Sequence, residues 1–565
     1  MVFEFTVTGQ SNSGGYLTTK IREKDKFIPF SGNSFFTQDP ILLCYPINEP
    51  LNEDALSNIQ NEVSGFVVCQ GGRAQDVLLF SSKLSRSRIF YSFSNNALLV
   101  SDDLRELLPY SKRRLKSEIA YAIIKFGEAP EYDTIIEDIY SIPAGSYLSF
   151  DNQILATYIM NRQVPYYDFK KYFSIKYSLK GGSLIETEQQ LKEALSAIRP
   201  KNPSILVSGG IDSTLLNYLY NEVCDAPYHA YFLDFKEATA ELDWAKRSVK
   251  NTKACFTPLA IDNNNFLKDF IGSVENLIYP VYDNGSALVG YKFNQYLKGD
   301  SSESFIDGTC ADSCYGVRNY LHPLKQGKPQ SRVMSTLKER IYMMALLNGW
   351  SWNRTKPRDA YLDDEFIQDL LWYGGPFVNF WFKNADKFTA TLSEKYKYYI
   401  DYIDRGGSCG YWEEYTVLKM MLYAAKQTTV KVYDMLKPHQ VYFPFMFSNI
   451  LQDQGKYNWS EKSEGYEAKA PLKKILEKFI DKEFISRKKT GLQSQTIRWM
   501  NEPSIKHYFI NLLLNSQVAP AMMGANYRNL IRAYAKENPD LSLVTLTLSL
   551  SVIHLWCDMN KVSIR

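Results

Sequence analysis

At about 150 residues per domain, the 565 residues of this chain amount to three or four domains, or to two large ones. The 65 Lys and Arg residues and 62 Asp and Glu residues leave a net charge of +3, which argues against a protein that mainly coats nucleic acid or an anionic membrane. Aromatic residues make up 14% of the chain. Because aromatic side chains fill cores and also line ligand pockets, this excess has two explanations.

The eight cysteines are spread along the chain without the spacing of a disulfide framework. Only Cys310 and Cys314 lie close together, and no further Cys or His pair follows at zinc-ligand spacing, so we expect two buried thiols there. The sequence shows no secretory signal and no apolar run of about 18 residues. These features predict a soluble cytoplasmic protein with no membrane and no nucleic-acid partner.

Residues 1–165 alternate short strand-like runs with clusters of Gly, Asn and Ser, which is typical of packed antiparallel sheets. Two segments interrupt this pattern, residues 51–61 and Ser117–Phe126, and the second follows a basic cluster that we interpret as a solvated helix start. We expect strands at Val2–Thr8 and at residues 41–45, 65–69, 77–80, 88–93 and 97–100. This part of the chain therefore predicts an α+β domain.

Residues 166–185, rich in Tyr, Lys and Gly, are expected to link this domain to a second one over residues 186–565. The second domain starts with an alternating pattern, which gives way to a mainly helical one beyond residue 330. The expected elements are a strand at 205–207, a helix at 214–220, a strand at 230–235, a helix at 240–251 and a strand at 256–261. This order predicts an α/β domain with a parallel sheet and crossover helices.

The loop at residues 208–213, Ser-Gly-Gly-Ile-Asp-Ser, lies between a predicted strand and a predicted helix. Its glycines let the backbone approach an anion closely, and the helix N-terminus adds N–H donors. Asp212 would repel a phosphate unless a divalent cation lay between them. A plain turn with a helix cap is the alternative, but the strand-loop-helix context favours a nucleotide site, and the loop lacks the Lys-Ser/Thr ending of a Walker A motif. The expected phosphate-binding residues are Ser208, Gly209, Gly210, Asp212 and Ser213.

This loop resembles the pyrophosphate-binding loop of asparagine-synthetase-type ATP pyrophosphatases, which cleave ATP between its α- and β-phosphates and adenylate a carboxylate. The resemblance implies ATP and Mg²⁺ as cofactors, and an adenine-nucleotide-hydrolase-like parallel sheet with helical additions. The family carries a second Mg-binding aspartate in a Ser-Gly-Glu-Gly-Ser-Asp pattern. Residues 307–312 are Asp-Gly-Thr-Cys-Ala-Asp, where Gly308 and Asp312 match. The resemblance therefore implies Asp212 and Asp312 as metal ligands and Gly308 as part of the ATP site.

Two further groups of site residues follow from the same resemblance. The Arg-x-Lys-x-Gly signature of the family corresponds to residues 487–491, so the resemblance gives Lys489 the role of stabilising charge during acyl transfer. In this fold adenine stacks beside the first two strands of the sheet. This implies Val207 and Phe232 as adenine contacts.

Residues 1–165 are similar to the glutaminase domain of this family, for example at residues 64–66, 89–91 and 142–145. The similarity implies an antiparallel β-sandwich with helices. Glutaminases of this fold use a cysteine at the mature N-terminus as their nucleophile, paired with its own α-amine. This sequence starts Met-Val-Phe, and its first cysteine is Cys44. We therefore expect a glutamine amidotransferase-like domain that lacks the nucleophilic cysteine.

Without a glutaminase, the amine that attacks the activated acid must come from the substrate or from a second substrate. Two branches of the family resemble this arrangement: β-lactam synthetases and lasso-peptide cyclases, which are macrolactam synthetases. β-Lactam synthetases carry a tyrosine of their catalytic dyad at the position where this chain has Thr309. We expect Thr309 to take part in catalysis. The family's Glu-x-Arg-x-Pro-Phe segment is Gln-Val-Tyr-Phe-Pro-Phe at residues 440–445. Both departures favour a cyclase, although the general base stays unassigned.

A lasso-peptide cyclase adenylates a side-chain carboxylate of a precursor peptide, joins it to the peptide's α-amine and releases AMP and pyrophosphate. The resemblance thus implies a precursor peptide as substrate and a leader peptidase as partner protein. Two alternatives stay open. One is a ligase of small molecules, as β-lactam synthetases are, and the other is an inactive nucleotide-binding homologue that acts as a partner protein.

Many of the tryptophans lie in one part of the chain. Five of the nine fall between residues 350 and 412, and they are Trp350, Trp352, Trp372, Trp381 and Trp412. Because bulky aromatic residues are more often core than ligand-binding, a helical core is slightly favoured over the wall of a peptide-holding cavity.

Overall fold

The protein was analysed as a computed structural model. Apart from short gaps inside the longer ranges, it describes residues 2–8, 16–23, 26–29, 35–36, 43–44, 65–71, 74–81, 89–150, 170–171, 175–176, 178–316, 381–400, 403–404, 440–487 and 498–564. The predicted interruption at residues 51–61 lies outside the described residues, and so does Lys489. Of the five clustered tryptophans only Trp381 is described, and it is buried in the core.

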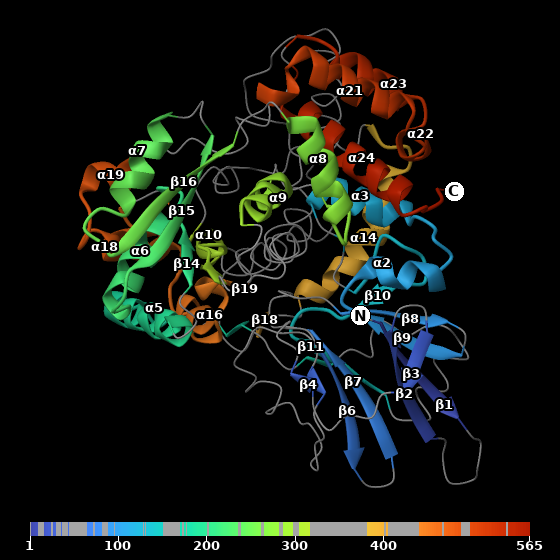
Figure 1. Cartoon of the computed structure of the whole chain (residues 1–565), viewed down its shortest axis with the longest axis horizontal. Coiled ribbons are helices and arrows are strands. Elements are labelled where there is room, and N and C mark those ends of the chain that lie inside the picture. Colours follow the sequence, from blue (N-terminus) through green and yellow to red (C-terminus); the bar gives the residue numbers. More distant parts are fainter. Residues whose placement is uncertain are drawn as a thin grey trace.

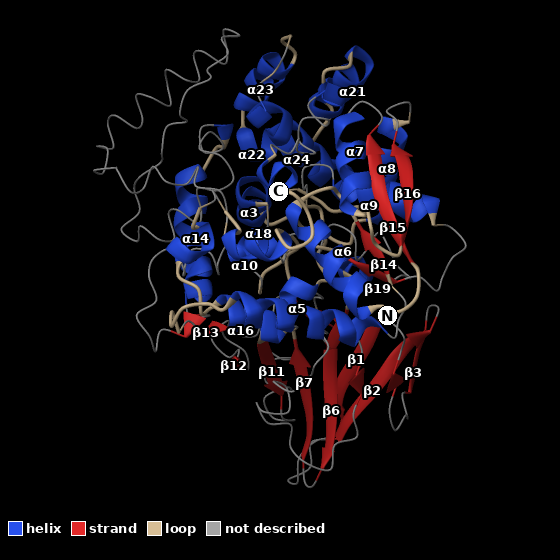
Figure 2. Cartoon of the chain, turned by 90° about the vertical axis from the view of Figure 1, so that its left-hand side faces the viewer, coloured by secondary structure: helices blue, strands red, loops and turns tan. Residues whose placement is uncertain are grey.

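Two antiparallel sheets occupy the lower end of the molecule in Figures 1 and 2. One has six strands in the order β10-β8-β9-β1-β2-β3, and the other has four in the order β12-β11-β7-β6. Their bounds are β1 Val2–Thr8, β2 Tyr16–Glu23, β3 Lys26–Pro29, β6 Gly65–Gly71, β7 Ala74–Phe80, β8 Phe90–Ser94, β9 Ala97–Ser101, β10 Tyr140–Ser141, β11 Ser146–Phe150 and β12 Lys170–Lys171. The rings of Phe93 in β8 and Phe150 in β11 meet edge to face, 6.3 Å apart.

Most of the strands expected in this region are confirmed, and β1 has the predicted bounds. A short pair, β4 (Phe35–Phe36) and β5 (Leu43–Cys44), covers part of the strand expected at residues 41–45. The pattern missed β2 and β3, because β2 is largely polar and forms no apolar run. Strand β2 is instead defined by its antiparallel pairing with β1 on one side and β3 on the other. Helices α2 (Leu104–Leu107) and α3 (Ser117–Phe126) follow, the latter at the predicted position.

The segment at residues 166–185 takes part in two different sheets. Strand β12 pairs with β11 of the N-terminal sheet, and β13 (Ile175–Lys176) pairs in parallel with β18 (Ile403–Asp404). Helix α5 (Leu184–Ile198) begins at the end of this segment, with Ser183 as its N-cap. The division into residues 1–165, 166–185 and 186–565 stays a prediction.

The predicted parallel sheet is present and has five strands in the order β16-β15-β14-β17-β19. All four neighbouring pairs are parallel. The strands are β14 Ser204–Leu206, β15 Tyr228–Phe235, β16 Ala254–Ile261, β17 Ser304–Ile306 and β19 Gln440–Tyr442. The chain is thus a mixed helix-and-sheet protein, with a parallel sheet as well as antiparallel ones.

Helices surround this sheet (Figure 1). Helix α6 (Ile211–Val223) packs against α5 and α18 (Ala470–Leu476), and α7 (Thr239–Ser248) packs against β15. Helix α9 (Ser286–Tyr296) packs against β16 and against α8 (Phe266–Asn276). Crossover helices are required because parallel neighbours cannot be joined by tight turns.

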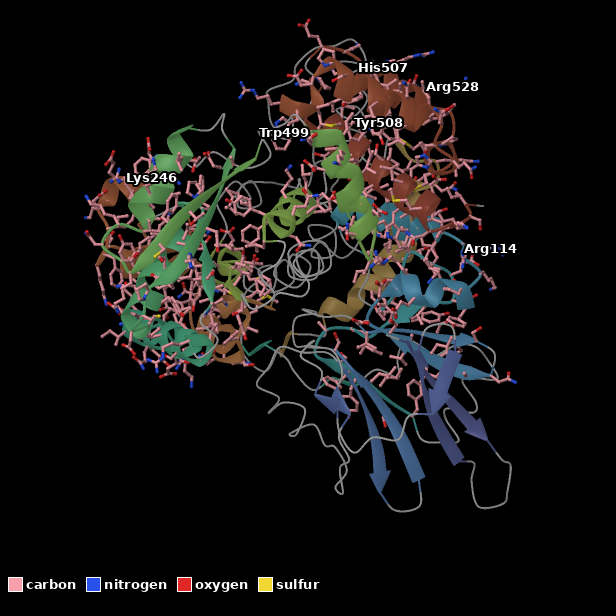
Figure 3. All side chains as sticks on the ribbon, in the orientation of Figure 1. Arg114, Lys246, Trp499, His507, Tyr508 and Arg528 are labelled. Carbon is pink, nitrogen blue, oxygen red and sulfur yellow. The ribbon has the colours of Figure 1, made fainter. Side chains whose placement is uncertain are left out.

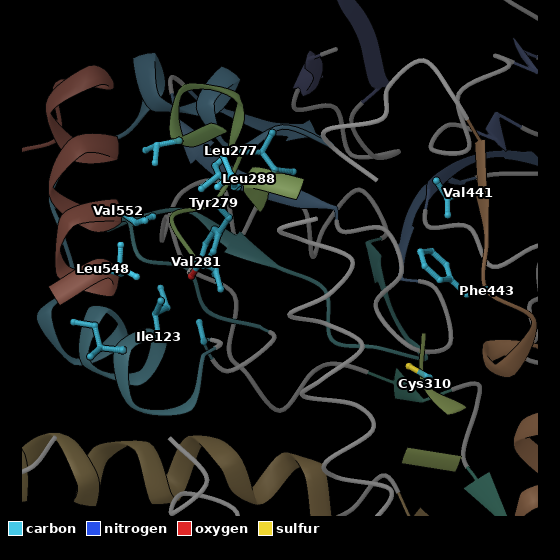
Figure 4. Close-up of a cluster of buried hydrophobic side chains, with 14 of the residues drawn as sticks. Ile123, Leu277, Tyr279, Val281, Leu288, Cys310, Val441, Phe443, Leu548 and Val552 are labelled. Atoms are coloured by element: carbon cyan, nitrogen blue, oxygen red, sulfur yellow. The ribbon is translucent and has the colours of Figure 1, made fainter. Parts of the chain in front are cut away.

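The C-terminal helices form a further layer around α24 (Leu541–Met559). They are α21 Pro503–Leu514, α22 Val518–Met523 and α23 Asn526–Tyr534, all packed against α24. Figure 4 shows Ile123 of α3 facing Leu548 and Val552 of α24, so α3 and the C-terminal helix share one core. Beside α8, the Trp499 ring contacts Phe266 at 5.3 Å (Figure 3).

Among the described residues, one helix is long and apolar enough to span a membrane. This is α24, over Ser542–Met559, but 67% of that window is buried inside the protein. Its neighbours α3, α8 and α21 cover it on several sides. The helix is therefore packed as a core helix.

A buried charge cluster ties the N-terminal part to α14 (Ala385–Ile400). The carboxylate of Asp133, 5% exposed, pairs with both Lys116 and Lys395. Burial alone would raise the pKa of Asp133, but the two lysines lower it below its ordinary value. The carboxylate is therefore ionised and holds two segments far apart in sequence.

Replacing this carboxylate, Asp133→Asn, should lower the free energy of unfolding by about 3 kcal/mol, because it leaves two half-buried lysines without their anion. Since the folded-state pKa is lowered, the stabilisation is present above the unfolded carboxyl pKa and is lost as the pH falls through the folded pKa. Urea titrations at neutral and acidic pH measure both effects. The control is Asp138→Asn, whose exposed pair with Lys112 should contribute less than about 0.5 kcal/mol. Equal losses for the two variants would contradict the prediction.

Candidate nucleotide and metal site

Two loops meet at the carboxyl edge of the parallel sheet. One follows β14 and leads into α6, and the other follows β17 and leads into α10 (Ala311–Tyr315). Strands β15 and β16 lie on one side of β14, and β17 and β19 lie on the other. The loops after β14 and β17 thus flank the point where the connections change direction, which is where open α/β sheets bind ligands.

The loops are in close contact. A Cβ atom added to Gly308 would lie 3.1 Å from the Cβ of Asp212 and 3.3 Å from the backbone nitrogen of Ser213. Any larger residue at this position would push the second loop away from α6. Gly308 therefore brings the segment of Asp312 beside the segment of Asp212, as the sequence pattern predicts.

The first loop is shaped by Gly209, which has φ +63° and lies directly on α7. A Cβ there would meet the backbone of Trp244 and Ala245 at 3.0 Å. The Ser208 backbone N–H donates to the Ser213 hydroxyl at 3.1 Å, which closes the loop on itself. Gly210, the N-cap of α6, has no side chain to cap the helix, so the helix start suits an external anion.

Lys469 brings the two predicted metal-binding carboxylates together. Its ammonium donates to both carboxylate oxygens of Asp212, at 2.7 and 2.8 Å, and pairs with Asp312 as well. The lysine side chain is 14% exposed. It lies at the start of α18, in the left-handed backbone region at φ +59°, and reaches the N-terminal turns of α6 and α10.

The electrostatics of this cluster favour a cation between the carboxylates. Burial alone would lower the pKa of Lys469, but attraction and hydrogen bonds from Asp212 and Asp312 raise it well above its ordinary value. A position that holds one ammonium between two carboxylates also has the hard oxygen ligands that Mg²⁺ prefers. No third His, Cys, Asp or Glu joins them within the described part of the chain. That set fits Mg²⁺, which commonly takes one or two carboxylates and completes its shell with water and phosphate oxygens.

The second loop holds a polar pair beside the cluster. The carboxylate of Asp307 accepts hydrogen bonds from both the hydroxyl and the backbone N–H of Thr309, the latter at 2.7 Å. The Asp307 N–H in turn donates to the Tyr442 carbonyl at 2.9 Å, so β19 supports this loop. Cys310 has φ +74°, where the family pattern carries Gly. Cys310 and Cys314 are both buried, as predicted, and burial raises the pKa of Cys314 to about 12.

The residues expected to bind adenine are packed in the core. Val207 is buried, and its N–H donates to the Tyr231 carbonyl at 2.9 Å. Phe232 is also buried, and its ring stacks on Phe256 with 6.3 Å between centroids. Lys489 lies outside the described residues, which reach Arg487 at the start of the same signature.

Sequence reasoning missed Lys469, Asp307, Arg487 and Glu241. Lys469 is 257 residues from Asp212 in sequence, and Lys is common in the segment around it. Asp307 could have been proposed as a site residue because it comes directly after a buried strand, where parallel sheets carry their binding loops. Arg487 lies in the Arg-x-Lys-x-Gly signature, but nothing in that signature indicates its contacts with Glu241 and the Gly209 carbonyl.

Removing the ammonium, Lys469→Met, should destabilise the protein by about 1–2 kcal/mol in metal-free buffer, because two neighbouring carboxylates then repel. Added Mg²⁺ should recover part of this loss, so Mg²⁺ should raise the Tm of the variant more than that of the wild type. Thermal unfolding with EDTA and with Mg²⁺ measures this. The control is Lys474→Met, because Lys474 lies in α18, which Lys469 precedes, and its ion pair with Glu464 is exposed at the surface. An equal Mg²⁺ effect on all three proteins would contradict the prediction.

Comparison with known proteins agrees with this geometry. The family model for asparagine synthase matches residues 187–556, and a search of curated proteins found no match. The matched range contains both loops, Lys469 and the whole parallel sheet. Members of this family are ATP-dependent carbon–nitrogen ligases and typically require Mg²⁺. The chain therefore belongs to the asparagine synthase family.

Proposed function

We propose that this chain cleaves ATP between its α- and β-phosphates to adenylate a carboxylate, and then passes the acyl group to an amine. The observation that carries the proposal is the cluster of Asp212, Asp312 and Lys469 next to the glycine loop. It combines an anion-binding helix start with a cation position between two carboxylates. That combination suits a pyrophosphate bound together with a metal.

Each residue of the site has a defined task in this proposal. The loop residues Ser208, Gly209, Gly210 and Ser213 hold the β- and γ-phosphates through backbone and hydroxyl donors. Asp212 and Asp312 would hold Mg²⁺, which when bound offsets the charge of the leaving pyrophosphate. Lys469 is placed to donate to phosphate oxygens once it leaves the carboxylates. Val207 and Phe232 would form the wall beside adenine, and Lys489 would stabilise the oxyanion of acyl transfer.

The bond changes are those of an AMP-forming ligase. A carboxylate oxygen of the substrate attacks the α-phosphorus, and the bond from that phosphorus to the pyrophosphate oxygen breaks. An amine nitrogen then attacks the acyl carbon, loses a proton and expels AMP. The net products are an amide, AMP and pyrophosphate.

For the acceptor, we propose a lasso-peptide cyclase, in which the carboxylate and the amine belong to one precursor peptide. The proposal is supported by the departure of residues 440–445 from the Glu-x-Arg-x-Pro-Phe pattern of the family. Gln440 and Tyr442 stand where the family carries Glu and Arg, and both lie in β19, which pairs with β17 next to the second loop. Substrate binding by a single folded peptide needs no separate ammonia channel, because proximity of the two reacting groups supplies much of the rate.

This proposal includes a leader peptidase as partner protein. It also divides the chain into a glutamine amidotransferase-like domain at residues 1–165, a linker at 166–185 and the ligase domain at 186–565.

A β-lactam-synthetase-like ligase of small molecules is the second candidate. A hydrogen-bonded Asp307–Thr309 pair stands at the position of the tyrosine dyad of those enzymes, although the loss of the tyrosine itself counts against their standard dyad. The products separate the two candidates.

The chain incubated with Mg-ATP and a short precursor peptide encoded beside it should release AMP and pyrophosphate. The peptide should lose one water and resist N-terminal degradation, because its α-amine has become an amide. Mass spectrometry and a pyrophosphate assay measure these outcomes. Asp212→Asn should lower the rate at least about 100-fold through loss of charge at the leaving group. ADP and phosphate as products, or an unchanged rate in the variant, would contradict the proposal.

We propose further that the Asp307–Thr309 pair serves acyl transfer rather than ATP binding. Asp307→Asn should then lower kcat for amide formation by about 10- to 100-fold and leave the KM for ATP nearly unchanged. Thr309→Val, which removes only the hydroxyl, should have a smaller effect in the same direction. Steady-state kinetics that follow AMP and amide separately make the measurement. A large rise in the KM for ATP would assign the pair to nucleotide binding instead.

A further inference from the structure

An ion pair at the glycine loop has no task in the chemistry described above. The guanidinium of Arg487 pairs with the carboxylate of Glu241 through two hydrogen bonds, at 3.1 and 3.2 Å. The two side chains are 8% and 12% exposed. Arg487 also donates to the Gly209 carbonyl at 2.7 Å, the shortest of its three contacts. The pair therefore joins the end of α19 (Lys482–Ser486) to α7 and to the loop.

The same face of α7 is clamped to α19 by a second, more exposed arginine. The Trp244 ring contacts Arg247 at 4.3 Å and Arg487 at 5.0 Å, and it meets the edge of the Phe484 ring at 5.5 Å. Arg247 also pairs with Asp481, the N-cap of α19, at 2.7 Å. This clamp fixes α19 on α7, and within the described residues the hydrogen bonds of Arg247 go to Asp481 and Glu483 of α19 and its cap rather than to the loop. Arg247 and Arg487 thus share a tryptophan and differ in their contact with Gly209.

The contact with Gly209 sets the direction of a phosphate-binding group. In a trans peptide, the carbonyl of one residue and the N–H of the next point in opposite directions. Because Arg487 holds the Gly209 carbonyl, the Gly210 N–H must point away from Arg487. It donates a long hydrogen bond to the Ser208 hydroxyl of the same loop, with 3.4 Å between nitrogen and oxygen. Gly209 and Gly210 have little intrinsic preference that would hold this peptide in place.

We propose that Arg487 and Glu241 are positioning residues that fix the Gly209–Gly210 peptide so that its N–H points toward bound pyrophosphate. This inference rests on the proposed function of the loop. The carboxylate of Glu241 offsets the charge of the guanidinium, so the pair acts by geometry rather than by attracting phosphate. The same arginine is the first residue of the signature that carries Lys489.

Calorimetric titration of the full chain with Mg-pyrophosphate, and with an ATP analogue carrying a methylene between its α- and β-phosphates, tests the role without any acyl substrate. Arg487→Met should weaken both ligands by about 10- to 100-fold, the effect of losing a charge-assisted hydrogen bond that orients the loop. The matched control Arg247→Met removes a guanidinium from the same tryptophan and should bind as the wild type does. Arg487→Lys should recover part of the affinity, since lysine can reach one of the two partners.

Arg487→Met leaves Glu241 buried without its partner, so Arg487→Met/Glu241→Leu serves as a second variant in which no buried charge remains. It should unfold near the wild-type temperature and still bind both ligands weakly. Wild-type affinity in this double variant would overturn the positioning role. If Arg247→Met weakened both ligands as much as Arg487→Met does, Arg487 and Glu241 would only help to stabilise the packing of α19 on α7. That result would also overturn the positioning role. Absence of binding by the wild type would instead overturn the nucleotide site itself, and the positioning role with it.

Discussion

The ammonium of Lys469 between Asp212 and Asp312 is the interaction on which the rest of the site depends. It joins α18 to the first turns of α6 and α10, three segments that are far apart in the sequence. Without a cation at this point the two carboxylates would repel, and this repulsion would oppose the close approach of the loops at Gly308, where even an added Cβ would lie only 3.1 Å from the Cβ of Asp212. Because one ammonium already fits there, the same position suits a metal bound with phosphate.

The departures of this chain from the family pattern lie on a different part of the sheet from the glycine loop. The first loop, fixed from behind by α7 and α19, holds the groups suited to ATP and pyrophosphate. The second loop and β19 carry the departures from the family pattern, at Thr309, Gln440 and Tyr442. A ligase can therefore keep one mode of ATP activation while it changes the acid and amine that it joins.

The sequence predicted the parallel sheet, its crossover helices and the glycine loop, because buried strands and glycine turns have strong local signals. It missed β2, which is largely polar and depends on its neighbours. The two aspartates that the sequence predicts as metal ligands, Asp212 and Asp312, are brought together by the fold, where both pair with Lys469. Lys469 could not be predicted, since a lone lysine becomes part of a site only when tertiary packing brings it there. Arg487 could be found as the first residue of its signature, but no sequence pattern predicts its hydrogen bond to the Gly209 carbonyl.

A crystal structure of the chain with Mg²⁺ and a non-hydrolysable ATP analogue tests the central claim most directly. The β- and γ-phosphates should lie on the loop at Gly209 and Gly210, with the metal between Asp212 and Asp312. Lys469 should have moved from the carboxylates onto phosphate oxygens. A triphosphate bound elsewhere, or Lys469 still between both carboxylates with nucleotide bound, would contradict the claim.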